Sequence, residues 1–125
     1  MKALVVDDSS AMRSYLRRIL AEHGFETAQA GDGEEALAVL DDAPRPDLIL
    51  LDWNMPGRNG FETLKEIRER DELSSVPVMM VTTEVDMSEV VMALDAGANE
   101  YLMKPFTPEI MSAKLELLGF GAITQ

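Results

Sequence analysis

Short apolar runs alternate along this chain with longer stretches in which apolar residues recur every three or four positions. The runs have the length of strands, and the longer stretches have the period of amphipathic helices. The expected strands are Ala3–Val6, Phe25–Ala30, Asp47–Leu51, Val76–Val81 and Glu100–Met103, and a helix is expected after each of them. This alternation predicts an α/β fold, a doubly wound parallel sheet of five strands with five helices on its two faces.

Signals at the ends of the expected helices support this division of the chain. Leu16 and Ile19 share the apolar face of the first helix, Arg13 is expected mostly on the opposite, exposed face, and Gly24 follows as a stop signal. Thr107 and Pro108 open the last helix, with a hydroxyl that can cap it and a proline suited to its first turn.

A length of 125 residues suits one domain, and no linker, repeat or low-complexity stretch divides residues 1–125. Residues 119–125 are expected to form a short tail. The absence of cysteine excludes disulfides, thiolate metal sites and thiol nucleophiles. No apolar run approaches the roughly 20 residues of a membrane span, and the first residues become acidic too soon for a signal peptide. We therefore expect a cytoplasmic protein that does not insert into a membrane.

The charge balance of the chain is strongly acidic. Eleven lysine and arginine residues stand against 23 aspartate and glutamate residues, which gives a formal net charge of −12. Such a surface repels nucleic acid and anionic lipid. We therefore expect no nucleic-acid partner, and a cation or another protein suits this field better.

Polar side chains abruptly replace apolar ones where four of the expected strands end. Asp7 and Asp8 follow the first strand, Asp52 the third, Thr82 the fourth and Lys104 the fifth. Ligands of doubly wound sheets bind beyond the carboxyl ends of the strands. The first and third strands are neighbours in such a sheet, so the three carboxylates are expected to converge there, opposite the lysine.

Three carboxylates in one crevice repel each other unless a cation joins them. Mg²⁺ is the expected cation, because it prefers oxygen ligands and is often held by one or two carboxylates. A carboxylate can attack phosphorus and form an acyl phosphate, a reaction that needs placement and charge neutralisation more than acid–base catalysis. Asp52, beside a metal and a lysine, is therefore a candidate phosphoacceptor.

Three other interpretations of these residues are weaker. A calcium loop starting at Asp52 would need an oxygen ligand at its fifth position and glutamate at its twelfth, where this chain has Pro56 and Thr63. A magnesium-dependent aspartyl-phosphate enzyme would share the nucleophile, but 125 residues leave no cap domain to build a substrate pocket. A flavodoxin-like FMN carrier would need a phosphate loop after the first strand, where two carboxylates stand instead.

Taken together, these motifs resemble a known family along nearly all of the chain. The residues similar to response-regulator receiver domains are Asp7-Asp8, Asp52-Trp53-Asn54-Met55-Pro56, Thr82 and Lys104-Pro105-Phe106. Segments 52–56 and 101–106 look most like the chemotaxis, CheY-like members. The resemblance implies the flavodoxin-like strand order 2-1-3-4-5, a cis Lys104-Pro105 bond, and a signalling module that catalyses only its own phosphorylation and dephosphorylation.

The resemblance also implies roles for the acidic residues. Asp52 would be the phosphoacceptor. Asp8 and Asp52 would bind Mg²⁺ through their side chains, Asn54 would bind it through its backbone carbonyl, and Asp7 would act mainly through water.

Further roles follow for the residues around them. Lys104 would pair with the phosphoryl oxygens, and Thr82 would swing inward to bond one of them. Tyr101 would follow Thr82 by moving from an outward to an inward rotamer. Asn54 and Glu84 flank the path of the attacking water and would tune dephosphorylation.

The partners implied by the resemblance are proteins. A histidine kinase would donate the phosphoryl group, and the surface of the fourth helix, fifth strand and fifth helix would bind the output partner, first of all a flagellar motor switch component. With no effector domain after Gln125, a monomer acting through binding is expected, with a phosphatase as a further partner. A phosphorelay intermediate or phosphate sink is the alternative. The nine methionines mostly suit core packing. Met87, Met92 and Met111, with the surplus apolar face of the last helix, could instead mark the docking surface.

Overall fold

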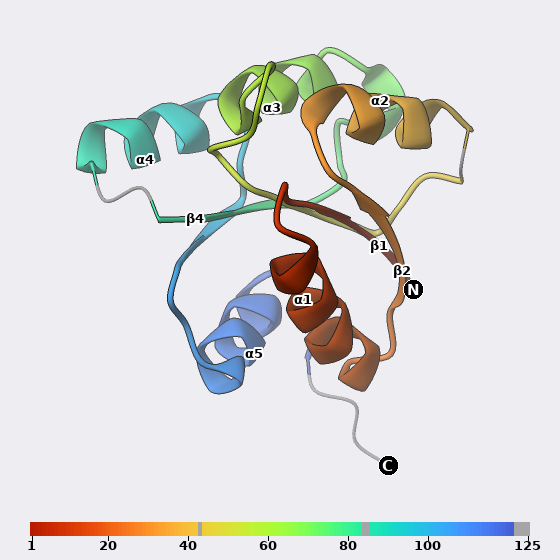
Figure 1. Ribbon diagram of the computed structural model, residues 1–125, viewed down its shortest axis with the longest axis vertical. Coiled ribbons are helices and arrows are strands. Elements are labelled where there is room, and N and C mark those ends of the chain that lie inside the picture. The colour runs from red at the N-terminus through yellow and green to blue at the C-terminus, as the bar shows by residue number, and fades with distance from the viewer. Residues whose placement is uncertain (43, 84–85, 122–125) are drawn as a thin grey trace.

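Five parallel strands form a single sheet in the order β2-β1-β3-β4-β5 in a computed structural model that describes residues 1–42, 44–83 and 86–121 (Figure 1). The strands are β1 (Lys2–Val6), β2 (Glu26–Ala30), β3 (Leu48–Leu51), β4 (Val78–Thr82) and β5 (Glu100–Met103). This confirms the predicted α/β class, the strand count and the strand order.

Helices cover both faces of the sheet. The helices are α1 (Ser10–Glu22), α2 (Gly33–Asp42), α3 (Gly60–Arg68), α4 (Met87–Asp95) and α5 (Pro108–Leu117), with a short 3₁₀ helix, η1 (Asp71–Leu73), after α3. In Figure 1, α1 and α5 lie on one side of the sheet, and α2, α3 and α4 lie on the other. None of the described helices is long and apolar enough to cross a membrane.

The sheet separates two hydrophobic cores, and the side chains of β3 alternate between them. Ile49 and Leu51 join the core beneath α2, α3 and α4, while Leu48 and Leu50 join the core beneath α1 and α5. All four are fully buried, as expected of a central strand covered on both faces. The edge strand β2 is more exposed, in agreement with its less apolar sequence.

Several predicted boundaries are confirmed. The Thr107 side chain accepts a hydrogen bond from the Ile110 N–H at 3.2 Å, and Pro108 opens α5. Gly24 adopts φ +87° just after α1, a conformation that side chains with a Cβ atom seldom adopt.

The expected start of the fourth strand is wrong. The strand begins at Val78 rather than Val76, because the Val76 N–H donates to the Leu73 carbonyl in the turn that closes η1. Of the three methionines with two open interpretations, Met111 fills the core beneath α1 and α5, where it is fully buried, and does not belong to a docking surface. Met87 and Met92, by contrast, are exposed on α4.

Candidate functional site

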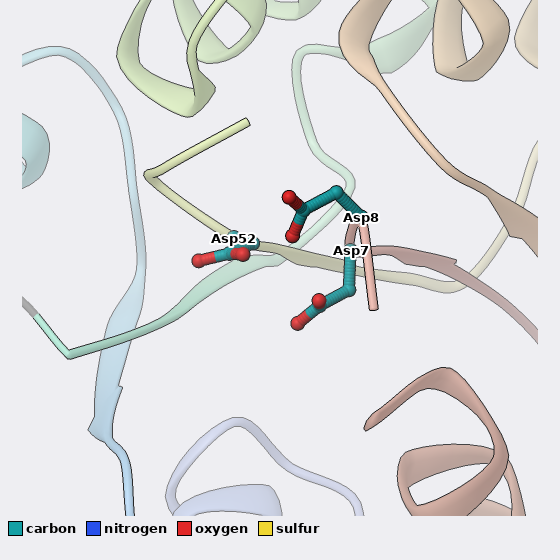
Figure 2. A group of neighbouring side chains, drawn as sticks. All are labelled: Asp7, Asp8 and Asp52. Carbon is teal, nitrogen blue, oxygen red and sulfur yellow. The ribbon is translucent and has the colours of Figure 1, made fainter. Parts of the chain in front are cut away.

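Three aspartates meet beyond the carboxyl ends of two neighbouring strands. Asp7 and Asp8 follow β1, and Asp52 follows β3, which pairs with β1. Figure 2 shows their carboxylates extending to the same side, and one oxygen from each residue lies within 4.8 Å of the others. The parallel register of Val6 with Leu51 places the two strand ends side by side and so produces this cluster.

Asp7 is buried, and both of its carboxylate oxygens have partners. Oδ1 accepts a hydrogen bond from the Ser9 N–H at 2.9 Å, and Oδ2 accepts one from Lys104 Nζ at 2.8 Å. Only 1% of its surface is exposed, so the charge-assisted bond to Lys104 is largely shielded from water. Asp8, the next residue, is exposed.

Lys104 reaches the cluster from the other half of the sheet. It follows β5, and its main-chain N–H donates to the Thr82 carbonyl at 2.9 Å, which ties it to the end of β4. Its Nζ lies 3.5 Å from Asp52 Oδ2, so one ammonium group contacts both Asp7 and Asp52. The Lys104-Pro105 peptide bond is cis.

The ionised form of the Asp52 carboxyl group is destabilised in the folded protein. Burial, and then the negative charge of Asp7, raise its pKa from the ordinary 3.8 to about 6. The positive charge of Lys104 and the main-chain N–H of Asn54 act in the opposite direction, while Asp8 raises the pKa further. Asp52 therefore has a raised pKa and yet stays mostly ionised at pH 7.

The loop after Asp52 is closed tightly by a glycine. The Gly60 N–H donates to the Trp53 carbonyl at 2.8 Å. A Cβ atom at position 60 would stand 2.1 Å from the Asp52 carbonyl oxygen, so only glycine fits. Trp53, beside the phosphoacceptor candidate, stacks on Phe61 with 5.5 Å between ring centroids.

The remaining predicted site residues lie on the same edge of the sheet or in its loops. Thr82 is the last residue of β4 and is fully buried. Asn54 is exposed in the loop after β3. Tyr101 is half-buried on β5 and packs against the core beneath α2, α3 and α4. Glu84 lies outside the described residues.

The cluster suits a hard divalent cation. Its three carboxylates carry three formal negative charges against one positive charge from Lys104, which leaves two charges for a cation to neutralise. Oxygens on opposite sides of a bound Mg²⁺ stand about 4 Å apart. A spread of 4.8 Å therefore needs only a small closure, and all the donors are oxygens.

Three contributors to the site escaped prediction from sequence. Ser9 was not singled out, although a serine directly after two aspartates at a helix start is a capping signal. The close approach of Gly60 to Asp52 has no local signal. Arg13 was assigned to the exposed face of α1, yet its Nη1 donates to the Asp7 carbonyl at 2.6 Å.

Comparison with known proteins agrees with this geometry. The family model described as the response regulator receiver domain matches residues 3–116. Over 119 residues the chain is 42% identical to the chemotaxis protein CheY1 of Helicobacter pylori, covering 94% of this chain and 96% of that protein. Over 124 residues it is 43% identical to a CheY homolog of Campylobacter jejuni, covering 98% and 95%.

Solved structures show the same likeness. Chemotaxis response regulator CheY4 of Vibrio cholerae superposes with a TM-score of 0.87 at 38% identity, covering 94% of this chain and 97% of that one. The Mn²⁺-bound form of response regulator Rcp1 gives a TM-score of 0.84 at 29% identity, covering 98% and 96%. The chain belongs to the response regulator receiver domain family and is of the CheY-like chemotaxis type.

Proposed function

We propose that this chain is the phosphoacceptor of a two-component chemotaxis pathway and takes a phosphoryl group from a histidine kinase onto Asp52 in the cytoplasm. The observation that carries this proposal is the buried Asp52 carboxylate, with Lys104 Nζ 3.5 Å away and two more aspartates beside it. Residues 1–125 would act as one receiver domain, with 119–125 as its tail. Family membership favours this signalling role over the enzyme and flavin alternatives.

The transfer step uses few groups. A carboxylate oxygen of Asp52 attacks the phosphorus of a phosphorylated histidine; an O–P bond forms as the P–N bond breaks, and the imidazole leaves with the electron pair. Lys104 holds charge that develops on the phosphoryl oxygens, and its bond to Asp7 aims its ammonium group into the site. The reaction depends on this placement, because phosphoryl transfer requires little acid–base work.

A divalent cation, Mg²⁺, completes the proposed site by neutralising charge on the carboxylates and the phosphoryl group. Asp8 and Asp52 are the proposed direct side-chain ligands, with the Asn54 backbone carbonyl as a third protein ligand. Asp7 is proposed to act through water, because both of its oxygens already accept hydrogen bonds. The Mn²⁺ in the related Rcp1 structure supports a divalent-cation site of this kind.

Labelling by acetyl phosphate tests the phosphoacceptor. With Mg²⁺, the wild-type chain should incorporate one phosphoryl group and Asp52→Asn should incorporate none, because an amide is not a nucleophile toward phosphorus. Asp47→Asn, which removes a carboxylate at the opposite end of β3, serves as the control and should label normally. Stoichiometric labelling of a folded Asp52→Asn variant would contradict the proposal.

We further propose that phosphorylation shifts the balance between two conformations of the surface formed by α4, β5 and α5. Thr82 would bond a phosphoryl oxygen, Tyr101 would follow inward, and a flagellar motor switch component would bind the result. Exposed apolar side chains already stand on these three elements: Met87, Val91, Met92, Leu94, Met103, Ile110 and Leu117. Asn54 and Glu84 are proposed to set the lifetime of the phosphoryl group, with a phosphatase as a further partner.

Binding of the motor switch component, with beryllofluoride as the phosphoryl mimic, tests the switch. Thr82→Ala should still be labelled on Asp52 but should lose about tenfold in partner affinity, a usual size for such coupling. Thr83→Ala, at the exposed neighbouring position, is the control. Unchanged affinity of Thr82→Ala for the motor switch component would contradict the switch. Absence of motor binding both with and without beryllofluoride would favour the relay or phosphate-sink alternative.

A further inference from the structure

Arg13 bridges the aspartate loop and the edge of the sheet. It lies in the first turns of α1, half-buried, and its guanidinium makes two hydrogen bonds. Nη1 donates to the main-chain carbonyl of Asp7 at 2.6 Å, and Nε donates to Gln29 Oε1 on β2 at 2.9 Å. The side chain thus links the loop after β1 to the neighbouring edge strand β2.

The hydrogen bond from Arg13 to the Asp7 carbonyl also constrains the orientation of Asp8. The Asp7 carbonyl belongs to the planar peptide unit that joins Asp7 to Asp8, so holding its oxygen also holds the direction in which Asp8 leaves the loop. The same loop is held on its other side by the Asp7 N–H, which donates to the Ala30 carbonyl at 3.1 Å. Among residues 1–42, 44–83 and 86–121, Arg13 provides the one hydrogen bond to the Asp7 carbonyl.

We propose that Arg13 is a positioning residue for the divalent cation: it fixes the Asp7–Asp8 peptide and so holds the exposed Asp8 carboxylate where the cation binds. The inference rests on the proposed cation site at Asp8 and Asp52. It adds a group that acts through the ligands without touching the metal, as outer-shell partners of metal ligands do.

A positioning role and a purely electrostatic role of Arg13 predict opposite effects of its replacement on Mg²⁺ affinity. In the described part of the chain, Arg13 forms no ion pair with a carboxylate, so its positive charge stands near the cation site and opposes cation binding. If only charge mattered, Arg13→Ala would bind Mg²⁺ more tightly and Arg13→Lys would bind it as the wild type does. If position matters, both variants bind it more weakly, because lysine cannot make two bonds from one planar group.

The test is a Mg²⁺ titration of metal-free protein, followed by the fluorescence of the single tryptophan, Trp53, and by calorimetry. Trp53 is buried next to Asp52 and reports on the site without any phosphoryl transfer. Arg13→Ala and Arg13→Lys should each raise the dissociation constant about tenfold, the lower end of outer-shell effects. Gln29→Met, which leaves the Asp7 bond but frees the guanidinium, should give a smaller increase.

Arg17 provides a matched control on the same helix. Its Nε donates to Thr27 Oγ1 on β2 at 2.9 Å, an anchor like that of Arg13. Within the described residues Arg17 makes no hydrogen bond to the aspartate loop. Arg17→Lys should therefore bind Mg²⁺ as the wild type does, and circular dichroism checks that every variant folds.

Each outcome decides the matter. Wild-type affinity in Arg13→Lys, tighter binding in Arg13→Ala, or an equal loss in Arg17→Lys would overturn the positioning role while leaving the cation site standing. If the Arg13 variants do not fold, unchanged affinity in Gln29→Met overturns it instead. Failure of the wild-type chain to bind Mg²⁺ would refute the cation site itself, and this inference with it.

Discussion

Asp52 shows how burial prepares a single residue for chemistry. Its carboxylate is only 5% exposed and faces the charges of Asp7 and Asp8, and Lys104 only partly compensates for them. Without a cation, ionising this group therefore costs free energy that folding must supply. The same feature makes a cation, or a phosphoryl group held by one, stabilising at this position.

The stability of the metal-free chain should fall as the pH rises from about 4 to about 6, the range between the ordinary and the folded pKa of Asp52. Because the folded pKa of about 6 exceeds the ordinary 3.8, the folded state binds the extra proton between these values. The contribution of Asp52 to the free energy of unfolding is therefore greatest below about pH 4, where the carboxyl group is protonated. This contribution is lost by about pH 6 to 7. Two pKa units at about 1.4 kcal/mol each correspond to about 3 kcal/mol, and solvent screening reduces this, so Asp52→Asn should be more stable than the wild type by about 2 kcal/mol at pH 8.

Urea unfolding in chelator at pH 8 and at pH 4 measures this difference. The advantage of Asp52→Asn should be present at pH 8 and absent at pH 4. Glu72→Gln removes the same charge from an exposed position on η1 and should show no such pH dependence. Parallel stability curves for Asp52→Asn and the wild type would show that Asp52 is not strained.

Among the elements, the junction of β3 and α3 leaves the least room for an added side-chain atom. Gly60 opens α3 directly against the Asp52 carbonyl. The helix is then held by a capping box, in which the Asn59 side chain accepts from the Glu62 N–H at 2.9 Å and Glu62 accepts from the Asn59 N–H at 3.0 Å. The start of α3 is thus fixed relative to the end of β3, and with it the position of Asp52.

Gly60→Ala should disturb both stability and the site. The added methyl group would stand 2.1 Å from the Asp52 carbonyl oxygen and 2.8 Å from Trp53 Cα, so the loop must move. We expect a loss of roughly 1–3 kcal/mol in unfolding free energy, the usual range for overpacking, together with weaker Mg²⁺ binding. Chemical denaturation and a Trp53 fluorescence titration measure the two effects.

Gly121→Ala is the matched control, because no described atom beyond its chain neighbours lies within 4 Å of the added methyl group there. It should change neither the unfolding free energy nor Mg²⁺ affinity. A Gly60→Ala variant as stable as the wild type would mean that the loop after β3 is looser than its close contacts indicate.

At the scale of the whole molecule, the net charge of −12 sets the response to cations. Any salt relieves self-repulsion in so acidic a chain, but a specific site responds to Mg²⁺ beyond this general effect. A ligand that binds only the folded state stabilises it by about 2.7 kcal/mol at a hundredfold excess over its dissociation constant.

Thermal unfolding at pH 8 separates these effects. Adding MgCl₂ should raise the midpoint of the wild-type chain above the value in sodium chloride of equal ionic strength. Asp8→Asn should respond alike to the two salts, because it lacks a proposed ligand of the cation. An equal midpoint for the wild type in both salts would argue that Mg²⁺ acts only by screening.

The sequence alone determined the elements and the residue types at the strand ends. Apolar runs and helical periods are local patterns, so they predicted five strands, five helices and the α/β class without any coordinates. The abrupt change from Val6 to Asp7 and from Leu51 to Asp52 likewise predicted carboxylates at one edge of the sheet. Strand order came from the family resemblance.

The sequence predicted Lys104 at the site, but only the tertiary structure decided its contacts and which further groups complete the site. Lys104 Nζ lies 2.8 Å from Asp7 Oδ2, although the two residues are 97 positions apart in the chain. Gly60 lies against the Asp52 carbonyl, where a Cβ atom would not fit. Arg13, expected on an exposed face, donates a hydrogen bond to the aspartate loop. The packing of α5 likewise decided that Met111 belongs to the core and not to a docking surface. These contacts depend on how elements pack against one another, and hydrophobic periodicity carries no information about the distance between two particular side chains.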